Sequence, residues 1–500
     1  MNKKAENTKI LFDPQSVAVI GASDNPGKLG FHVMKSLTKG GFSGGIIPVN
    51  PGADEVMGLK AFPSVAAYNG QIDLAIVVLP AKLVPGVFRE CAAEGVKGIV
   101  LITAGFKEID DPGGADLHEK IAGIANEAGI PVIGPNTFGM INLQADLNAS
   151  FTPEFSRLMK GSVALVSQSG GISHLLGFLA MRMDVGFSKI IGLGNRLNVD
   201  FAEMVDYLMD DPDTRVIMLY MEGIDDPVRL LETAKRHHGE KPIIVYKTGR
   251  SEKSDQASQS HTGSMAGRHE IYTGTFSQAG VLAVDNTEAL LDTAKALSGA
   301  PLPDGPGVAV LSGQAGPGMA ACDVCEARGL KIVCFTEKTQ QKINAHLPPL
   351  ALRTNPVDMG PAWYDSSAME EIIKAAMNDD NVDGMLFMMV FASANVDALK
   401  GIRGLLEDWA QKKPLISCIL SPPGVWDEQI KALEQSGSLI NYPTPERAAN
   451  AMANLWKYRE MQIRRRFLEK RYRAELKEGG GTNENYSKSH KGRPDIAFGA

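Results

Sequence analysis

Short apolar runs recur along the chain, and each is followed by a glycine-rich turn and a segment of helical length. The three clearest runs are Ser16–Ile20 before Gly21-Ala22-Ser23, Ser162–Val166 before Ser167-Gln168-Ser169-Gly170-Gly171, and Gly307–Leu311 before Ser312-Gly313-Gln314-Ala315-Gly316-Pro317-Gly318. Runs of this kind, rich in β-branched residues, are typical of strands buried on both faces of a parallel sheet. Because the three openings are about 145 residues apart, they predict three α/β units in tandem.

Other apolar runs continue this alternation of strand and helix. The further predicted strands are Asp73–Leu79, Gly98–Ile102, Pro131–Ile133, Lys189–Gly192, Arg215–Tyr220, Pro242–Tyr246, Lys331–Phe335, Gly384–Val390 and Pro414–Ile419. Asp116–Ala128 and Asp226–His237 have helical length and spacing. The pattern predicts an α/β protein of three doubly wound parallel sheets with right-handed crossovers.

Turn-forming segments suggest where these units meet. Asn148-Ala149-Ser150 and Ser298–Pro303 are the predicted joints, which gives domains at residues 8–148, 149–300 and 301–455. From Trp456 to Glu478 the chain is dense in Arg and Lys with aromatic and aliphatic residues between them. We expect a basic helix there, either solvated or packed on the body or a partner, and a disordered polar end from Gly479 to Ala500.

Composition narrows the class of protein. The 500 residues include 51 Lys and Arg against 58 Asp and Glu, for a formal net charge of −7, so a general nucleic-acid binder is not expected. No apolar run approaches the roughly 18 residues that span a membrane, and the first residues lack the apolar core of a signal peptide. Five cysteines, an odd number, fit a reducing cytoplasm better than a disulfide framework.

The three glycine-rich turns are candidate ligand sites, because ligands of open α/β sheets bind at the carboxyl ends of the strands. The turn Gly21-Ala22-Ser23 indicates a nucleotide or coenzyme site, although it is not GxGxxG and a plain strand-to-helix turn is nearly as good an interpretation. Ile102-Thr103-Ala104 and Gly134–Asn136 end two later strands of the same unit. We therefore expect all three strand ends to line one sheet edge.

The turns of the second and third units favour an anion. Ser169, Gly170 and Gly171 open one predicted helix, and Gly316 and Gly318 lie at the start of another. Small residues at a helix start leave backbone N–H groups facing outward, where the helix dipole favours negative charge. Two such starts in consecutive domains suggest a phosphoryl group held between opposed dipoles.

A long polar segment follows the strand Pro242–Tyr246. It runs for about twenty residues with almost no apolar content, and a loop of that length in a compact domain is usually functional or disordered. His261 lies in it among small residues, and a neutral imidazole can act as a nucleophile at pH 7. Glu222 follows another strand and could orient that imidazole by a hydrogen bond. The alternatives are a surface histidine and an exposed glutamate.

These segments resemble one family. GAS after the first strand, GPNTFGM, SQSGG, YMEG and above all SHTGSMAG are similar to the α subunit of ADP-forming (NDP-forming) acyl-CoA synthetases, relatives of succinyl-CoA synthetase. The resemblance covers about residues 8 to 455, and Asn355-Pro356-Val357-Asp358 and Asn441–Ala448 extend it into the third unit. It implies a Rossmann-like CoA-binding domain followed by two flavodoxin-like ligase domains.

The resemblance also implies roles for individual residues. His261 would be the phosphorylated histidine and Glu222 its orienting carboxylate. CoA would bind at Gly21, Ala22, Ser23, Ile102, Thr103, Ala104 and Asn136. The phosphate would lie at Ser169, Gly170, Gly171, Gly316 and Gly318. His174 takes the place of a substrate-contacting tyrosine of succinyl-CoA synthetases, which suggests another acid as substrate.

The sequence departs from the family pattern in two respects. Gly52 follows Val49-Asn50-Pro51, where the family often has a lysine that meets the CoA phosphates; Lys28 or Lys60 would have to substitute. No ATP-grasp domain follows the third unit, so a separate ATP-grasp β subunit is implied, with ADP or ATP and Mg²⁺ bound there, in a hetero-oligomer.

The implied reaction interconverts acyl-CoA, ADP and phosphate with a carboxylic acid, ATP and CoA, through acyl-phosphate and phosphohistidine. Two alternatives stay open at this stage. One is a CoA-binding regulatory protein without catalysis. The other is an NAD(P)-dependent oxidoreductase, which would need an acidic residue near the end of the second strand; Asp54 and Glu55 lie a little beyond it.

Overall fold

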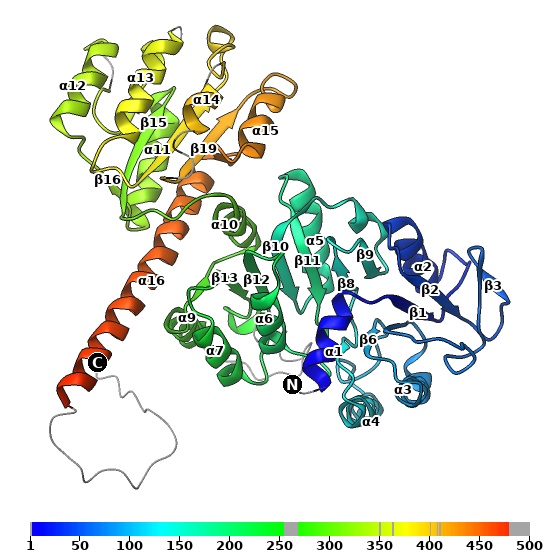
Figure 1. Cartoon of the computed structure of the whole chain (residues 1–500). Helices are drawn as coiled ribbons and strands as arrows, with labels where there is room; N and C mark the ends of the chain where they lie inside the picture. The colour runs from blue at the N-terminus through cyan, green and yellow to red at the C-terminus, as the bar shows by residue number, and fades with distance from the viewer. Residues whose placement is uncertain are drawn as a thin grey trace.

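The computed structural model describes residues 3–254, 269–349, 352–362, 365–400, 402–407, 409 and 412–479. Three mainly parallel sheets follow one another along the chain and are flanked by helices (Figure 1). Their strands are almost entirely buried, which explains the uninterrupted apolar runs. The predicted α/β class with doubly wound sheets is confirmed.

The first sheet has five strands in the order β2-β1-β5-β6-β7. Its strands are β1 (Ser16–Ile20), β2 (Gly45–Val49), β5 (Leu74–Val77), β6 (Gly98–Leu101) and β7 (Val132–Ile133), with a small pair β3 (Glu55–Val56) and β4 (Leu59–Lys60) beside it. Its helices are α1 (Lys3–Phe12), α2 (Leu29–Gly40), α3 (Val84–Ala93) and α4 (Pro112–Ala128). The order is that of a doubly wound sheet, with the switch between β1 and β5.

The second sheet has seven strands in the order β14-β13-β12-β10-β11-β8-β9. The strands are β8 (Gly139–Asn142), β9 (Leu147–Ser150), β10 (Lys160–Ser167), β11 (Phe187–Gly192), β12 (Val216–Met221), β13 (Ile243–Lys247) and β14 (Val281–Ala283). The helices are α5 (Gly170–Arg182), α6 (Phe201–Asp210), α7 (Pro227–Arg236), α9 (His269–Gln278) and α10 (Thr287–Gly299). The five parallel strands have the flavodoxin-like order 2-1-3-4-5.

The hairpin of β8 and β9 differs from the sequence-based domain boundary. The predicted division between residues 148 and 149 cuts through β9, and the predicted joint at Asn148–Ser150 is buried strand. β8 pairs antiparallel with β11, so the hairpin belongs to the second sheet by its hydrogen bonds. It also packs against α2 of the first domain, so it joins the two domains.

The third sheet repeats the order of the second. Its strands are β15 (Gly307–Ser312), β16 (Lys331–Ile332), β17 (Val357–Asp358), β18 (Gly384–Val390), β19 (Leu415–Leu420) and β20 (Ile440–Asn441). The main path is β16-β15-β18-β19-β20, and β17 pairs with β15. The helices are α11 (Ala315–Ala327), α12 (Glu337–His346), α13 (Ser366–Met377), α14 (Ile402–Glu407) and α15 (Asp427–Gln435).

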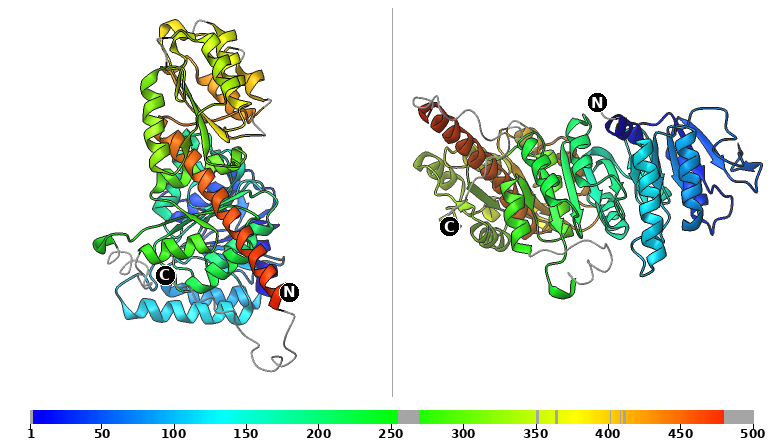
Figure 2. Two further views of the ribbon diagram at one scale, coloured as in Figure 1. Left: turned by 90° about the vertical axis from the view of Figure 1, so that its left-hand side faces the viewer. Right: turned by 90° about the horizontal axis from the view of Figure 1, so that it is seen from below.

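The last helix is longer than the basic segment that the sequence predicts. α16 (Pro445–Gly479) begins inside the third domain, where it packs against α11, β18 and β19, and it continues past α10 to β14 of the second domain. Figure 2 shows it as one rod along the molecule. Tyr458 is buried, whereas Phe467 and Leu468 are more than half exposed. The helix is therefore packed on the body in its first part and exposed farther on.

Candidate functional site

The first candidate turn lies at the switch point of the first sheet, directly after β1. Gly21 has a φ of +99°, which favours glycine, and its N–H donates to the Val49 carbonyl of β2 at 3.0 Å. A Cβ on Gly30, at the start of α2, would overlap the Gly21 carbonyl oxygen. The Ala22 carbonyl accepts from the Asn50 amide at 2.8 Å, and Ser23 is buried. In this turn, which we call the CoA cradle (Gly21-Ala22-Ser23), the backbone after β1 and the start of α2 approach each other closely.

The other two predicted strand ends lie beside this turn. The Thr103 hydroxyl donates to the Leu79 carbonyl at 2.7 Å, and Asn136 N–H donates to the Thr103 carbonyl at 2.9 Å. Asn136 has a φ of +58°, and Ile102 is buried directly after β6. The ends of β5, β6 and β7 are thus joined by hydrogen bonds. The structure brings Ile102, Thr103 and Asn136 together as expected.

The second candidate turn lies at the switch point between β10 and β12. The Ser169 hydroxyl caps α5 by accepting from Ile172 N–H at 3.3 Å, and the Ser167 hydroxyl donates to the Ser169 carbonyl at 2.9 Å. A Cβ on Gly170 or Gly171 would meet its nearest atoms at 3.9 and 3.8 Å, which is ordinary contact. Packing therefore does not demand glycine at these two positions.

Glu222 lies directly after β12, and its main chain is held by Gln168. The Gln168 side-chain carbonyl accepts from Glu222 N–H at 2.7 Å and from Gly223 N–H at 3.1 Å. Gln168 is 93% buried, since its relative exposure is 7%. Gln168 belongs to the SQSGG motif, but its type and position in the sequence did not indicate this role. It joins the turn after β10 to the main chain of Glu222.

The third candidate turn repeats this arrangement at the switch point between β15 and β18. The Gln314 side chain donates to the Val390 carbonyl at 2.7 Å and accepts from Val390 N–H at 3.2 Å. No side chain caps α11. A Cβ on Gly316 would meet no atom within 4 Å, and one on Gly318 would approach Ser312 Cβ at 3.0 Å. The start of α11 is therefore open at Gly316.

His174 is held by the protein itself. Its Nδ1 donates to the Gly170 carbonyl at 2.7 Å, so in the neutral ring Nε2 accepts from the Thr152 hydroxyl, also at 2.7 Å. The aromatic rings around it are Phe138, Phe151, Phe155 and Phe178, with centroids 5.1 to 6.0 Å away. A substrate carboxylate would have to displace Thr152 to reach a ring nitrogen. The substrate role of His174 stays a prediction.

His261 lies in residues 255–268, outside the described part of the chain. The segment leading to it is described as far as residue 254. Thr248 N–H donates to the Met221 carbonyl at 2.9 Å, so the chain leaves β13 beside the strand end that precedes Glu222. Arg250 pairs with Asp285 at 3.1 Å and donates to the Val284 carbonyl at 2.9 Å. The described stem therefore begins next to Glu222.

Burial governs the shifted pKa values near these turns. Burial, together with the positive charge of Lys107, lowers the pKa of His118 on α4 to about 4. Burial raises the pKa of Tyr220, at the end of β12, to about 12. Both groups are therefore neutral at pH 7.

Cys322 and Cys325 lie on α11, and Asp200 lies at the start of α6. Burial raises the pKa of Cys322 to about 11 and that of Cys325 to about 12, and both thiols lie on α11. Across the described ranges no group of three His, Cys, Asp or Glu side chains could hold a metal ion. Asp200 caps α6 in a capping box with Glu203, which is a structural role.

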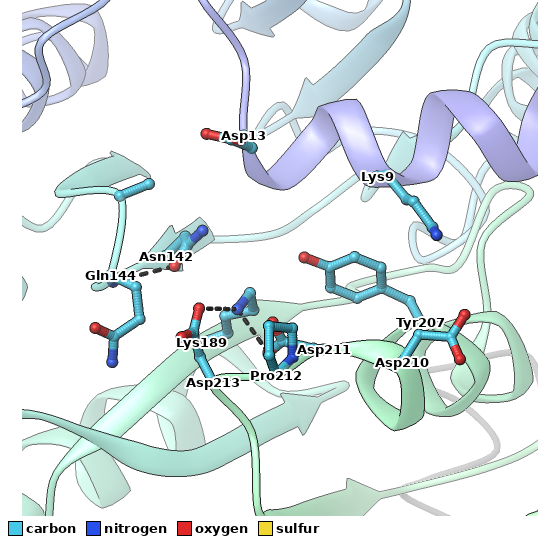
Figure 3. A pocket seen from close by; sticks show the side chains of 11 residues that line it. Lys9, Asp13, Asn142, Gln144, Lys189, Tyr207, Asp210, Asp211, Pro212 and Asp213 are labelled. Carbon is cyan, nitrogen blue, oxygen red and sulfur yellow. Dashed lines mark hydrogen bonds and ion pairs between the residues drawn. The ribbon is translucent and has the colours of Figure 1, made fainter.

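A cavity of about 460 Å³ lies at the opposite edge of the second sheet (Figure 3). It is lined by α1, the β8–β9 hairpin and the segment that precedes β12. The buried Lys189 ammonium pairs there with Asp211 at 2.6 Å, and Tyr207 stacks on Phe12. Because this is the amino edge of the strands, the cavity does not belong to the candidate site.

Comparisons with known proteins agree with this geometry. A model of CoA-binding domains matches residues 15–142, and a model of the succinyl-CoA ligase-like flavodoxin domain matches residues 160–297. The chain is 38% identical over 451 residues to the α subunit of acetate–CoA ligase [ADP-forming] II of Pyrococcus furiosus, covering 88% of this chain and 95% of that protein. The chain belongs to the ADP-forming acyl-CoA ligase family. The predicted membership and enzyme class are confirmed.

Two further relatives extend the comparison. The dinucleotide-forming acetyl-coenzyme A synthetase 1 of Ca. Korarchaeum cryptofilum, solved with phosphate and ADP, superposes with a TM-score of 0.84 at 35% identity, over 91% of this ligase chain and 97% of that one. The acetate–CoA ligase [ADP-forming] of Methanocaldococcus jannaschii is 35% identical over 94% of this chain but only 66% of its own length. The oxidoreductase and the non-catalytic alternatives are not favoured.

Matches to proteins named α subunits imply that this ligase works with a separate β subunit. CoA is supported as its ligand by the family model of the first domain. The described helices include none with both the length and the apolar character needed to cross a membrane. The roles of individual residues stay predictions, since no comparison tests them.

Proposed function

We propose that this chain supplies the CoA site, the phosphate site and the phosphohistidine of an ADP-forming acyl-CoA ligase. The observation that supports the proposal most directly is the pair of hydrogen bonds that the Gln168 side chain accepts. It joins the anion turn at Ser169 to Glu222, beside which the chain leaves β13 toward His261. An anion, a carboxylate and an imidazole would thereby meet at one switch point, where α/β sheets bind ligands.

The first half of the reaction is a transfer of the acyl group. A phosphate oxygen attacks the thioester carbonyl of acyl-CoA, the C–S bond breaks, and CoA leaves as its thiol. The N–H groups at the start of α5, and those of α11 at Gly316, would stabilise the charge on the phosphate. CoA would be held in the cradle of Gly21, Ala22 and Ser23 and along Ile102, Thr103, Ala104 and Asn136.

The second half is phosphoryl transfer. An imidazole nitrogen of His261 attacks the phosphorus of the acyl-phosphate, and the carboxylate leaves. The Glu222 carboxylate would hold the other ring nitrogen and stabilise its proton. ADP on the partner then takes the phosphoryl group as the N–P bond breaks. Positioning and electrostatics dominate this chemistry, since phosphoryl transfer asks little covalent work of the protein.

The partner that we propose is an ATP-grasp β subunit, in a hetero-oligomer, with ADP or ATP and Mg²⁺ bound there. Relatives named α subunits are covered over 95% and 97% of their length, which supports this division of labour. We propose a small carboxylic acid as substrate, with acetate tested first, because the relatives with 35–38% identity are named for acetate. The five unpaired cysteines support a cytoplasmic location.

The test uses the chain co-purified with its ATP-grasp subunit. With [γ-³²P]ATP and Mg²⁺, the wild-type chain should acquire acid-labile label, and His261→Ala should abolish it while leaving CoA binding intact. His346→Ala, which changes a histidine on α12 of the third domain, is the matched control and should label normally. Persistent acid-labile label in His261→Ala would refute the assignment.

A further inference from the structure

We infer that Glu108 and Asn195 form a clamp that positions the CoA-binding domain against the phosphate turn of the second domain. The inference rests on the proposed function and adds two positioning residues to it. Glu108 follows β6 of the first sheet, and Asn195 follows β11 of the second. The two residues are 87 positions apart, and neither was singled out from the sequence.

Glu108 gathers three donors from both domains. Its Oε1 accepts from Gly105 N–H at 2.5 Å, and its Oε2 accepts from Phe106 N–H at 3.1 Å and from the Asn195 amide at 2.5 Å. Gly105 directly follows the predicted CoA residues Thr103 and Ala104. The carboxylate therefore shapes the turn that would hold CoA and attaches it to the second domain, and hydrogen bonds to a charged acceptor are the strong ones.

Asn195, on the second-domain side of the clamp, uses both its side chain and its main chain in hydrogen bonds. Its relative exposure is 8%, its N–H donates to the Pro135 carbonyl at 2.9 Å, and its amide oxygen lies 3.4 Å from the Asn136 amide nitrogen. One buried side chain thus contacts both the β6 turn and the β7 turn. A shift of Asn195 would move both predicted CoA segments.

The loop that carries Asn195 is itself fixed to the phosphate turn. Leu193 N–H donates to the Ser167 carbonyl at 2.8 Å, and Leu197 N–H donates to the Gly134 carbonyl at 2.9 Å. Gly194 has a φ of +54°, and a Cβ there would overlap the Pro135 carbonyl oxygen. The loop after β11 is therefore a short bridge between the end of β10 and the CoA turns.

Charges next to the clamp support the same contact. Arg196, whose side chain is 1% exposed, pairs with Asp225 at 3.0 Å and with Asp200 at 3.1 Å. Lys107 of the first domain approaches the same Asp225 at 3.9 Å. Asp225 lies three residues after Glu222. Lys107 and Arg196, the neighbours of Glu108 and Asn195, thus share Asp225, and the pair with Lys107 crosses the domain boundary.

The functional consequence is confined to one step. If the clamp sets the distance between the CoA thiol and the phosphate, its loss should slow thioester formation, since a misplacement of 1 Å can cost about 10²-fold. Phosphorylation of His261 by ATP should not depend on it, since that step does not involve CoA. A merely structural role would lower labelling together with thioester formation.

The experiment exchanges the hydrogen-bonding partners. Asn195→Asp places a carboxylate against Glu108, Glu108→Gln places an amide N–H against the Asn195 amide, and the double variant restores a donor–acceptor pair. The wild type and the variants, each with the β subunit, are compared in CoA affinity by calorimetry, ³²P labelling of His261, and single-turnover thioester formation. Asn195→Ser, which adds no charge, serves if Asn195→Asp does not fold.

We expect each single variant to form thioester about 10²-fold more slowly at saturating CoA, with His261 labelling unchanged. The double variant should recover about tenfold of that loss, as coupled residues do. Unchanged thioester rates in the single variants, or a double variant no better than the slower single one, would overturn the clamp. Absence of label in the wild type would instead count against the proposed function, so the two failures can be told apart.

Discussion

The turns after β10 and β15 use the same frame with different side chains. In both, a serine ends the strand and its hydroxyl donates to the carbonyl two residues on. The N–H of the residue after the serine then donates to a carbonyl of the neighbouring strand, at 3.2 Å for Gln168 and 2.8 Å for Gly313. In both, a glutamine ties the turn across the switch point. The frame is thus common to the two flavodoxin-like domains.

The difference lies in what each glutamine holds. Gln168 holds the main chain of Glu222, whereas Gln314 holds that of the apolar Val390. Ser169 caps its helix, whereas α11 has no side-chain cap. Under the proposed function, the second domain would supply a carboxylate as well as an anion site, and the third domain would supply the helix N–H groups at the start of α11.

The largest expected effect separates the two glutamines. Gln168→Ala leaves two buried N–H groups without their acceptor and frees Glu222, so His261 labelling should slow about 10²-fold. The free energy of unfolding should fall by about 1–3 kcal/mol. Gln314→Ala should cost similar stability but leave the labelling rate near that of the wild type. Urea unfolding and labelling kinetics measure both quantities, and equal slowing in the two variants would erase the distinction.

The glycines give the next effect. Gly171→Ala and Gly316→Ala add a methyl group that the protein can accommodate, so unfolding free energy should stay level or rise by up to about 1 kcal/mol. The KM for phosphate should nevertheless rise about tenfold, equivalent to about 1.4 kcal/mol, because the methyl group lies where an anion approaches.

Gly30→Ala provides the contrast within the same chain. Its methyl group overlaps the Gly21 carbonyl oxygen, so this variant should lose about 1–3 kcal/mol of stability. If Gly171→Ala and Gly316→Ala leave the KM for phosphate unchanged, the two turns are ordinary helix starts.

A smaller effect concerns the side-chain cap of α5, because α11 has no such cap. Ser169→Ala should lower the free energy of unfolding by about 1 kcal/mol and raise the KM for phosphate. Asn286→Ala removes the equivalent cap from α10, where Asn286 accepts from Ala289 N–H at 2.7 Å. It should cost similar stability without changing that KM. Identical kinetics in the two variants would leave Ser169 a capping residue alone.

The smallest effect is a pH dependence of the free energy of unfolding, caused by His118 in the first domain. The pKa of His118 is lowered from 6.5 to about 4 in the folded protein, so between these values only the unfolded chain takes up the proton. Stability should therefore fall as the pH drops from about 6.5 toward 4, and His118→Phe should make that fall shallower. Urea unfolding between about pH 7 and pH 5 measures it. Parallel curves for the two proteins would contradict the assignment.

Most strands and all three candidate turns could be predicted because their signals are local. A run such as Gly384–Val390 is apolar throughout, since both sheet faces are covered, and its predicted limits equal those of β18. The hairpin β8–β9 was not predicted because its strands are short and include the buried residues Asn142 and Asn148. The Asn142 amide donates to the distant Phe12 carbonyl, and the Asn148 amide donates to the nearby Thr152 carbonyl. The pattern of the sequence does not show that these buried amides have hydrogen-bond partners.

The contacts that join the candidate residues could not be predicted for a different reason. Gln168 and Glu222 are 54 residues apart, and Glu108 and Asn195 are 87 apart, so nothing local links them. The strand order brings Gln168 and Glu222 together at a switch point, and the packing of the first two domains brings Glu108 to Asn195. The start of α16 at Pro445 was also missed, because the sequence marks where its basic residues begin rather than where the helix begins.

The long final helix determines how the two flavodoxin-like domains can move. At 1.5 Å per residue, its 35 residues extend about 52 Å, and it packs on elements of both sheets. Arg465 also donates to the Lys235 carbonyl at the end of α7, at 2.9 Å. A shared helix of this kind resists bending between the domains. The orientation of one flavodoxin-like domain relative to the other is accordingly set by a single continuous helix.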